Sequence, residues 1–271
     1  DDLKNAHKYI LENARATFTM NIPESKPELK DAVMGEIEKL PTTKQNLPEK
    51  QNVYKSNTEN SVITKERQVS QADINETFKF KLNSTPKESA IISILTSMLT
   101  SSSIGLFDTL REKEHLAYSV RAVADSIGNC GSIALKILTT TENENIGEIS
   151  YENIQKSING FNRQLNSLIN SEYTDEDLEN AKRQLKATIL NLEGVPCKVN
   201  ALSRGLNTKD GIEYDNNVYN EIDSITREDI DNFAKKIFKN PPVYTIVASK
   251  NSLEANKDFL NSLKTGSDEI L

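Results

Sequence analysis

Arg111 and Tyr118 are the residues whose types and spacing offer the clearest chemistry. They lie seven positions apart in Leu106–Val120, which reads LFDTLREKEHLAYSV. A helix end carries Arg111, a short turn follows, and a strand then carries Tyr118. Both side chains can donate hydrogen bonds, so a functional role for the pair is one interpretation. A plainer interpretation also stands, in which Arg111 pairs with Glu112 or Glu114 and Tyr118 faces the core.

Metal chemistry within the chain is not predicted. A protein zinc site needs three or four ligands, and the two histidines, His7 and His115, are far apart. Neither H-x-x-E-H nor H-E-x-x-H occurs, and G-x-S-x-G, the P-loop and GxGxxG are also absent. We expect His7 on a helix surface and His115 in the turn between Arg111 and Tyr118.

Composition narrows the class of protein. The chain has 271 residues, a net charge of −7 and a pI of about 5.2, which argues against a general nucleic-acid binder. No apolar run approaches the roughly 18 residues that a membrane span requires. Cys130 and Cys197 do not form a disulfide framework, and we expect both to be unpaired. The start of the chain lacks a signal-peptide pattern, and with the cysteine usage this favours a cytoplasmic location.

The first 61 residues predict a short succession of elements. Apolar spacing indicates a helix over 2–13, a strand over 16–22 and a helix over 27–40 that begins with Pro27. Residues 41–61 are polar and carry no periodic pattern, so we interpret them as a linker.

Beyond the linker, the pattern predicts an α+β fold with an antiparallel or mixed sheet backed by helices. Strands are expected over 74–82, 116–125, 131–139 and 243–247, the second and third joined as a hairpin through Gly128. Helices are expected over 86–100, 151–168, 174–192, 227–239 and 252–264, with a frayed tail after Gly266. The apolar stripe over 151–168 could form a coiled-coil seam or, more simply, pack against the sheet. Thr174 and Thr226 each precede a helix and an acid three positions on, which predicts N-terminal caps.

The two ends of the chain resemble each other. Asp2 aligns with Asp229, and without a gap Ile10 then meets Ile237, with the same order of helix, strand and helix. This indicates that residues 1–40 are the end of one repeat and that a second repeat follows. A first copy in this position would lack the strands with which its own strand should pair, so we expect it to dock on another part of a longer chain or on a partner.

The stretch F-x-x-L-R-E-K-x-x-L-A-Y-S-V from Phe107 to Val120 resembles the second-half signature of the M16 zinc metallopeptidases, the insulinase, mitochondrial-processing-peptidase and pitrilysin family. Further similarities lie at Gln71-Ala72, at Thr174-x-x-Asp177-Leu178 and at Thr226-x-Glu228-Asp229. The resemblance covers the whole chain: 1–40 match the last helix, strand and helix of a first half, 41–61 a linker, and 62–271 a C-terminal, non-zinc half with a LuxS/MPP-like fold. One departure is His115, where the family usually has Gly, which indicates a turn that His tolerates less well.

The resemblance implies a division of labour. The first half of such a protein carries H-x-x-E-H and its zinc, and the second half closes over it as the wall of a chamber that encloses peptides. Arg111 would then bind a substrate carbonyl, and Tyr118 would stabilise the oxyanion as zinc-activated water attacks. Zinc is expected in the missing half, and this chain itself is expected to bind no cofactor. The expected partners are a zinc-bearing half, either fused or separate, and a peptide substrate.

Three hypotheses follow. The chain is the substrate-binding, non-zinc half of an M16-type metalloendopeptidase and is inactive by itself. Alternatively, it is a catalytically inactive M16-like structural or assembly subunit, although such a subunit would not need Arg111 and Tyr118. The third hypothesis is an unrelated α+β binding domain.

Overall fold

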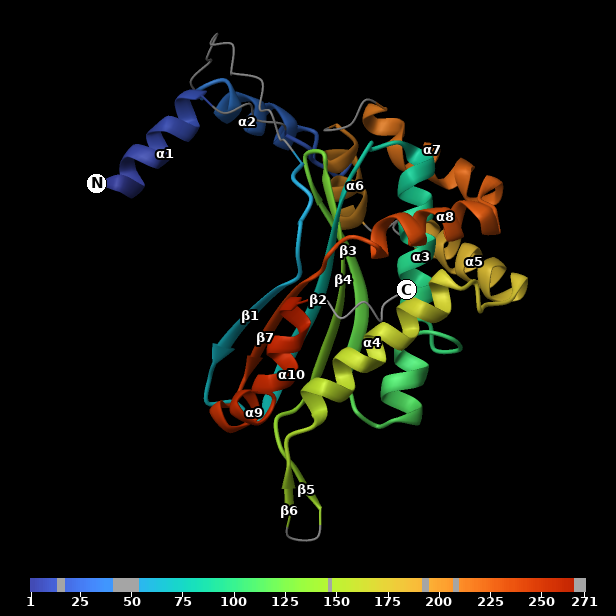
Figure 1. The fold of residues 1–271 in the computed structure, drawn as a ribbon. Coiled ribbons are helices and arrows are strands. Elements are labelled where there is room, and N and C mark those ends of the chain that lie inside the picture. The colour runs from blue at the N-terminus through green and yellow to red at the C-terminus, as the bar shows by residue number, and fades with distance from the viewer. Residues whose placement is uncertain (14–17, 41–53, 146–147, 192–194, 207–209, 266–271) are drawn as a thin grey trace. The chain divides into compact units, whose positions relative to one another are not determined.

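The computed structural model describes residues 1–13, 18–40, 54–145, 148–191, 195–206 and 210–265 (Figure 1). The chain forms two compact units. Unit 1 comprises Asp1–Gln51 and Leu190–Asn217, and unit 2 comprises Asn52–Ile189 and Val218–Leu271. Unit 2 contains the main sheet and the whole motif around Arg111 and Tyr118.

A five-stranded mixed sheet forms the centre of unit 2 (Figure 1). Its strands, in their order across the sheet, are β1 (Ser61–Glu66), β7 (Val243–Ala248), β2 (Gln71–Lys81), β4 (Cys130–Thr140) and β3 (Ser119–Ile127). The β1–β7 pair is parallel and the other three pairs are antiparallel. A separate two-stranded ribbon joins β5 (Asn143–Asn145) to β6 (Glu148–Ser150). The prediction of a mixed sheet backed by helices is confirmed.

Strand β2 lies at the middle of this sheet and shows a regular alternation of side chains. Ala72, Ile74, Phe78 and Phe80 are buried on one face, and the residues between them lie on the other. Glu76 shares the buried face and is 1% exposed. The predicted strand over 74–82 is therefore real, but it begins three residues earlier, at Gln71.

The predicted hairpin joins β3 to β4. Ile127 pairs with Cys130, so Gly128 and Asn129 form a two-residue turn, and Gly128 adopts a φ of 60° that glycine allows at little cost. Gly131 faces Phe80 on β2, and a Cβ at this position would lie 2.4 Å from the Phe80 ring. The small residue therefore lets the aromatic ring pack flat against the strand. Cys130 is a free thiol, and the side chain of Cys197 lies outside the described part of the chain.

Helices cover the apolar face of the sheet. The helices of unit 2 are α3 (Pro86–Thr100), α4 (Asn153–Ile169), α8 (Arg227–Phe238), α9 (Lys250–Ala255) and α10 (Lys257–Ser262), while α5 (Asp175–Asn191) and α7 (Tyr214–Glu221) run across the division between the units. Helix α4 packs on β2 and β4 and also contacts α8. Its predicted stripe is buried from Ile154 to Leu168, which confirms packing against the sheet as the reason for the stripe.

Both predicted helix caps are present. The amide N–H of Asp229 donates to Thr226 Oγ1 at 3.2 Å, and the Thr226 N–H donates to Asp229 Oδ2 at 2.9 Å. Thr174 and Asp177 repeat this reciprocal arrangement before α5. Each cap satisfies N–H groups that have no partner within the helix.

The predicted closing helix over 252–264 is wrong in one respect, because it is divided into α9 and α10 at Asn256. The backbone of Asn256 leaves the helical region, with φ −99° and ψ 9°. Its side-chain Nδ2 donates to the Tyr151 carbonyl at 2.7 Å and to the Ser252 carbonyl at 2.8 Å. A buried amide that binds backbone carbonyls in this way competes with continued helical hydrogen bonding.

Unit 1 contains α1 (Asp2–Asn13), α2 (Glu28–Ile37) and α6 (Val195–Gly205). The predicted helices over 2–13 and 27–40 are confirmed, with the second ending at Ile37. The predicted strand over 16–22 is wrong where it can be judged: residues 18–22 carry no strand, and 16–17 lie outside the described residues. A strand requires a neighbour for its backbone groups, and none of the described strands pairs with this segment.

Two predictions fall wholly or partly outside the described residues. Of the predicted linker over 41–61, residues 41–53 are not described, 54–60 carry no helix or strand, and Ser61 already begins β1. The predicted frayed tail after Gly266 also lies outside the described part of the chain.

Candidate functional site

A short π-helical segment, η1 (Phe107–Lys113), carries Arg111. Leu110 anchors this segment to the core, because it is fully buried and lies against Gly160 of α4. A Cβ on Gly160 would lie 2.3 Å from a methyl group of Leu110. The close approach of α4 to η1 therefore sets the position of the segment that presents Arg111.

Arg111 lies on the surface, with its side chain 45% exposed. Its guanidinium lies 4.9 Å from the centroid of the Phe107 ring, and its Nε is 3.8 Å from Glu112 Oε1. Glu114 instead pairs with Arg163 of α4 at 2.5 Å. The predicted surface ion pair of Arg111 with Glu112 is thus present, as a long contact. The Phe107 ring also supports the planar guanidinium.

The turn after η1 passes through His115, which adopts a φ of 49°. This is the left-handed conformation that glycine favours, and His adopts it here despite the cost of its Cβ. The Leu116 N–H then donates to the Leu110 carbonyl at 2.8 Å, which closes the turn. His115 therefore lies in a turn, as predicted, and the turn has the geometry that the family's usual glycine implies.

Tyr118 lies just before β3 and is 72% exposed. Alternation along the predicted strand would have placed it in the core with Val120 and Ala122. Instead the Tyr118 N–H donates to the Leu138 carbonyl at 2.8 Å. Thr139 of β4 occupies the buried position opposite it, and its Oγ1 donates to the Leu116 carbonyl at 2.6 Å. The core interpretation of Tyr118 is wrong, because this shift in pairing turns the ring toward solvent.

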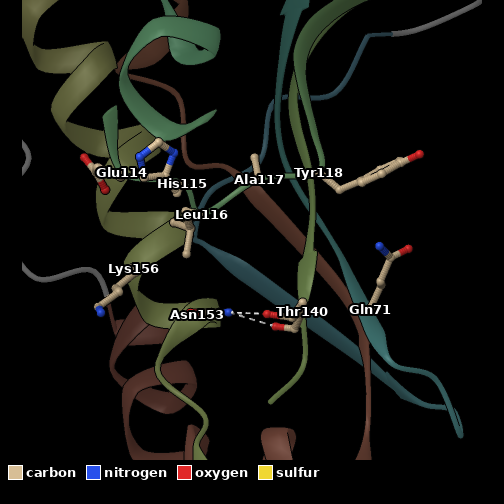
Figure 2. A pocket seen from close by; sticks show the side chains of 9 residues that line it. All are labelled: Gln71, Glu114, His115, Leu116, Ala117, Tyr118, Thr140, Asn153 and Lys156. Carbon is tan, nitrogen blue, oxygen red and sulfur yellow. Dashed lines mark hydrogen bonds between the residues drawn. The ribbon is translucent and has the colours of Figure 1, made fainter. Parts of the chain in front are cut away.

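Tyr118 lines an open pocket of about 500 Å³ at the end of the sheet (Figure 2). The residues that form it are Gln71, Glu114, His115, Leu116, Ala117, Tyr118, Thr140, Asn153 and Lys156. In Figure 2 Tyr118 and Gln71 lie to one side of the strand that carries Thr140, and Glu114, His115 and Lys156 lie to the other side, near α4. Arg111 is not among the lining residues.

Asn153 fixes the floor of the pocket where α4 begins. It is 4% exposed, and its Nδ2 donates to the Thr140 carbonyl at 3.1 Å and to Thr140 Oγ1 at 2.8 Å (Figure 2). Lys156 lies one turn further along the helix and pairs with Glu152. Sequence reasoning did not identify Thr140, Asn153 or Lys156 as site residues, because only the folded chain brings the start of α4 to the end of β4.

The described residues of this chain do not form a zinc site. His7 lies on α1 in unit 1 and His115 in the turn of unit 2. Among the residues that the structure describes, no three His, Cys, Asp or Glu side chains converge as ligands would.

The fold is an α+β domain with an exposed Tyr beside a pocket and no convergent metal ligands in the described part. Residues 1–185 match the family model described as the peptidase M16 inactive domain, and the chain belongs to that family. A comparison with curated protein sequences gave no match. Among the described helices, none has both the length and the apolar character needed to cross a membrane.

Solved structures share this fold. A protease from Helicobacter pylori superposes with a TM-score of 0.65 at 15% identity, covering 84% of this chain and 54% of that one. A peptidase M16 inactive domain from Pseudomonas fluorescens gives 0.59 at 16%, covering 71% and 44%. The periplasmic protease PqqL from Escherichia coli gives 0.55 at 13%, covering 85% and 24%. The chain thus spans about half the length, or less, of the proteins that it resembles, and at these identities the likeness concerns the fold alone.

Proposed function

We propose that this chain is the substrate-binding, non-zinc half of an M16-type metalloendopeptidase that hydrolyses peptides in a closed chamber. The observation that carries the proposal is Tyr118, whose ring leaves the sheet beside an open pocket at the place where alternation would bury it. An exposed aromatic ring with a hydroxyl group beside an open pocket is available to contact a bound ligand. Membership of the family supports a zinc-bearing half as the partner.

In this proposal the two residues act on one peptide bond. Arg111, supported by the Phe107 ring, donates to a carbonyl oxygen of the substrate and holds the peptide in place. Tyr118 donates a hydrogen bond from its hydroxyl group to the oxygen on which negative charge develops. A donor of this kind lowers the barrier by about 3–4 kcal/mol when it is held in position before the reaction. The zinc-bearing half supplies the activated water.

The test is the hydrolysis of a quenched fluorescent peptide by the chain assembled with its zinc-bearing half. Tyr118→Phe is expected to lower kcat about 100- to 1,000-fold with little change in KM, because it removes a contact made in the transition state. Arg111→Ala is expected to raise KM as well, because Arg111 also holds the ground state. The matched control is Tyr219→Phe on α7, which keeps the ring whose centroid lies 5.5 Å from Lys186 Nζ. If hydrolysis survives both site substitutions in a folded assembly, the proposal is wrong.

One observation favours the second function, a structural or assembly subunit. Unit 1 exposes large apolar side chains, among them Leu3 at 87%, Ile10 at 57% and Phe18 at 50%. Such residues mark a surface that another part of an assembly covers. We therefore propose that residues 1–40, interpreted as the end of a preceding repeat, dock on the zinc-bearing half. If Leu3→Asp abolishes assembly while Tyr118→Phe leaves hydrolysis unchanged, the chain is a scaffold.

A further inference from the structure

The face of the main sheet opposite the helices is a charged surface that the site described above does not use. Strand alternation assigns its residues, because the buried positions of β2, β4, β3 and β7 point to the helices, except for the small Ala134 of β4. The register then shows which residues lie side by side on the other face. One row runs from Arg121 through Lys136, Asn75 and Thr245 to Ile63.

Arg121 and Lys136 are direct cross-strand partners in this row. Side chains at such positions have Cβ atoms about 5 Å apart, and like charges there destabilise the sheet. Among the described residues neither cation has a carboxylate within 4.0 Å, although many other lysines and arginines do. The pair therefore brings a cost in stability that no direct ion pair among the described residues offsets.

The whole face is positive, although the chain is not. Its cations are Lys65, Lys79, Lys81, Arg121 and Lys136, and its carboxylates are Asp73 and Asp125. Asp73 lies in the row next to Lys136 and accepts a hydrogen bond from Asn75 at 3.1 Å. An excess of cations here contrasts with the net charge of −7 for the chain. This separation of charge indicates a ligand with negative charge.

The row lies close to the pocket. Arg121 follows Tyr118 by three residues on the same strand, which corresponds to about 10 Å along an extended backbone. A peptide held at Tyr118 would thus present a side chain to Arg121 and Lys136 two to four residues away from the held bond.

We propose that Arg121 and Lys136 form a binding site for the acidic side chains of an extended peptide, and so set the substrate class of the Tyr118 pocket. This inference rests on the proposed function for the choice of a peptide as ligand. The charge itself would suit any polyanion. However, a pair of cations beside a pocket fits an extended chain that contacts the pocket and the two cations at once.

The experiment measures binding of the 271-residue chain to two fluorescein-labelled, unstructured twelve-residue peptides that differ only in carrying Glu-Glu or Gln-Gln at their centre. The Glu peptide is expected to bind about tenfold more tightly at low salt, and less so at 0.5 M NaCl. In the double variant Arg121→Gln with Lys136→Gln this preference is lost. The control, Lys235→Gln with Lys236→Gln on the exposed side of α8, makes the same change in net charge and keeps the preference.

A stability measurement distinguishes a binding site from a fold requirement. Arg121→Gln is expected to raise Tm by about 1–3 °C, because it relieves the like-charge pair. A lower Tm would show a structural role and would overturn the inference. Equal affinity for both peptides, or tighter binding of a twelve-base oligothymidine than of the Glu peptide, would also overturn it. None of these outcomes depends on kcat of Tyr118→Phe, so the proposed function can fail separately.

Discussion

Helices α1 and α8 carry the same sequence pattern but lie in opposite surroundings. Ile230, Ile237 and Phe238 of α8 are at most 5% exposed and pack against the sheet and α4. The aligned residues of α1 are Leu3, Ile10 and Leu11, with exposures of 87%, 57% and 42%. An apolar stripe thus shows that a helix has a face to bury, but it does not show whether the partner for that face belongs to the same unit.

The segments after these helices differ in the same way. After α8 the chain enters β7, which pairs with β1 on one side and β2 on the other. After α1, residues 18–22 have a comparable composition, yet form no strand. Backbone pairing, rather than the local preference for extended structure, decides whether such a segment becomes a strand.

The largest effect should come from placing a charge on each stripe. Ile237→Asp buries a carboxylate without a partner, so we expect it to lower the free energy of unfolding by at least about 4 kcal/mol. Ile10→Asp at the aligned position should change it by less than about 0.5 kcal/mol in the isolated chain. Urea denaturation of both variants measures the difference. A large loss for Ile10→Asp would show that α1 is buried in solution and would end the comparison.

A second effect concerns Glu76, an acid that is 1% exposed. Burial raises the pKa of the Glu76 carboxyl to about 8, and the neighbouring Tyr244 hydroxyl opposes this rise. The two residues are cross-strand partners, but no hydrogen bond of normal geometry joins them. The folded chain therefore keeps the Glu76 proton at a pH where the unfolded chain, with a pKa near 4.5, has lost it.

It follows that stability falls as pH rises between about 4.5 and about 8, by about 1.4 kcal/mol per pH unit from this group. Glu76→Gln removes this slope. The measurement is the difference in free energy of unfolding between wild type and Glu76→Gln at pH 5, 6, 7 and 8. A difference that stays constant across this range would show that Glu76 is ionised in the folded chain.

The smallest effect on the free energy of unfolding concerns the N-terminal cap of α8. Thr226→Ala removes the capping hydroxyl of α8 and should cost about 1 kcal/mol in the free energy of unfolding. Thr226→Ser keeps a hydroxyl and should restore most of this loss. Thermal denaturation of the two variants gives the comparison. Equal losses in both would mean that the methyl group, rather than the hydrogen bond, stabilises the start of α8.

Sequence patterns predicted the elements wherever a regular stripe meets a partner. Helix α3 has the predicted bounds, and α4, α5 and α8 lie within two residues of theirs. Strand β1 was not predicted, because it is a short edge strand whose residues from Ile63 to Glu66 are exposed and so give no alternation. The break at Asn256 was also missed, since it depends on a carbonyl of Tyr151, far away in the sequence.

The candidate site was predictable only in part. Alternation placed Tyr118 in the core, and only the resemblance of the whole motif to a known signature pointed to it as a functional residue. Its actual exposure depends on Thr139 taking the buried place, which is a feature of two strands together. Gln71, Asn153 and Lys156 come to the same pocket from β2 and α4, and no local pattern could bring them together.

The order of strands has a consequence for the growing chain. Strand β7 lies between β1 and β2, yet among the described strands it is the last to be synthesised. Until residue 248 has been made, β1 has no neighbour and the inner edge of β2 stays open. Such edges invite pairing with other chains, and pairings over long sequence separation form slowly. A chain truncated before β7 would therefore expose two unpaired strand edges. Pairing of β7 with both β1 and β2 removes these edges and with them a site of aggregation.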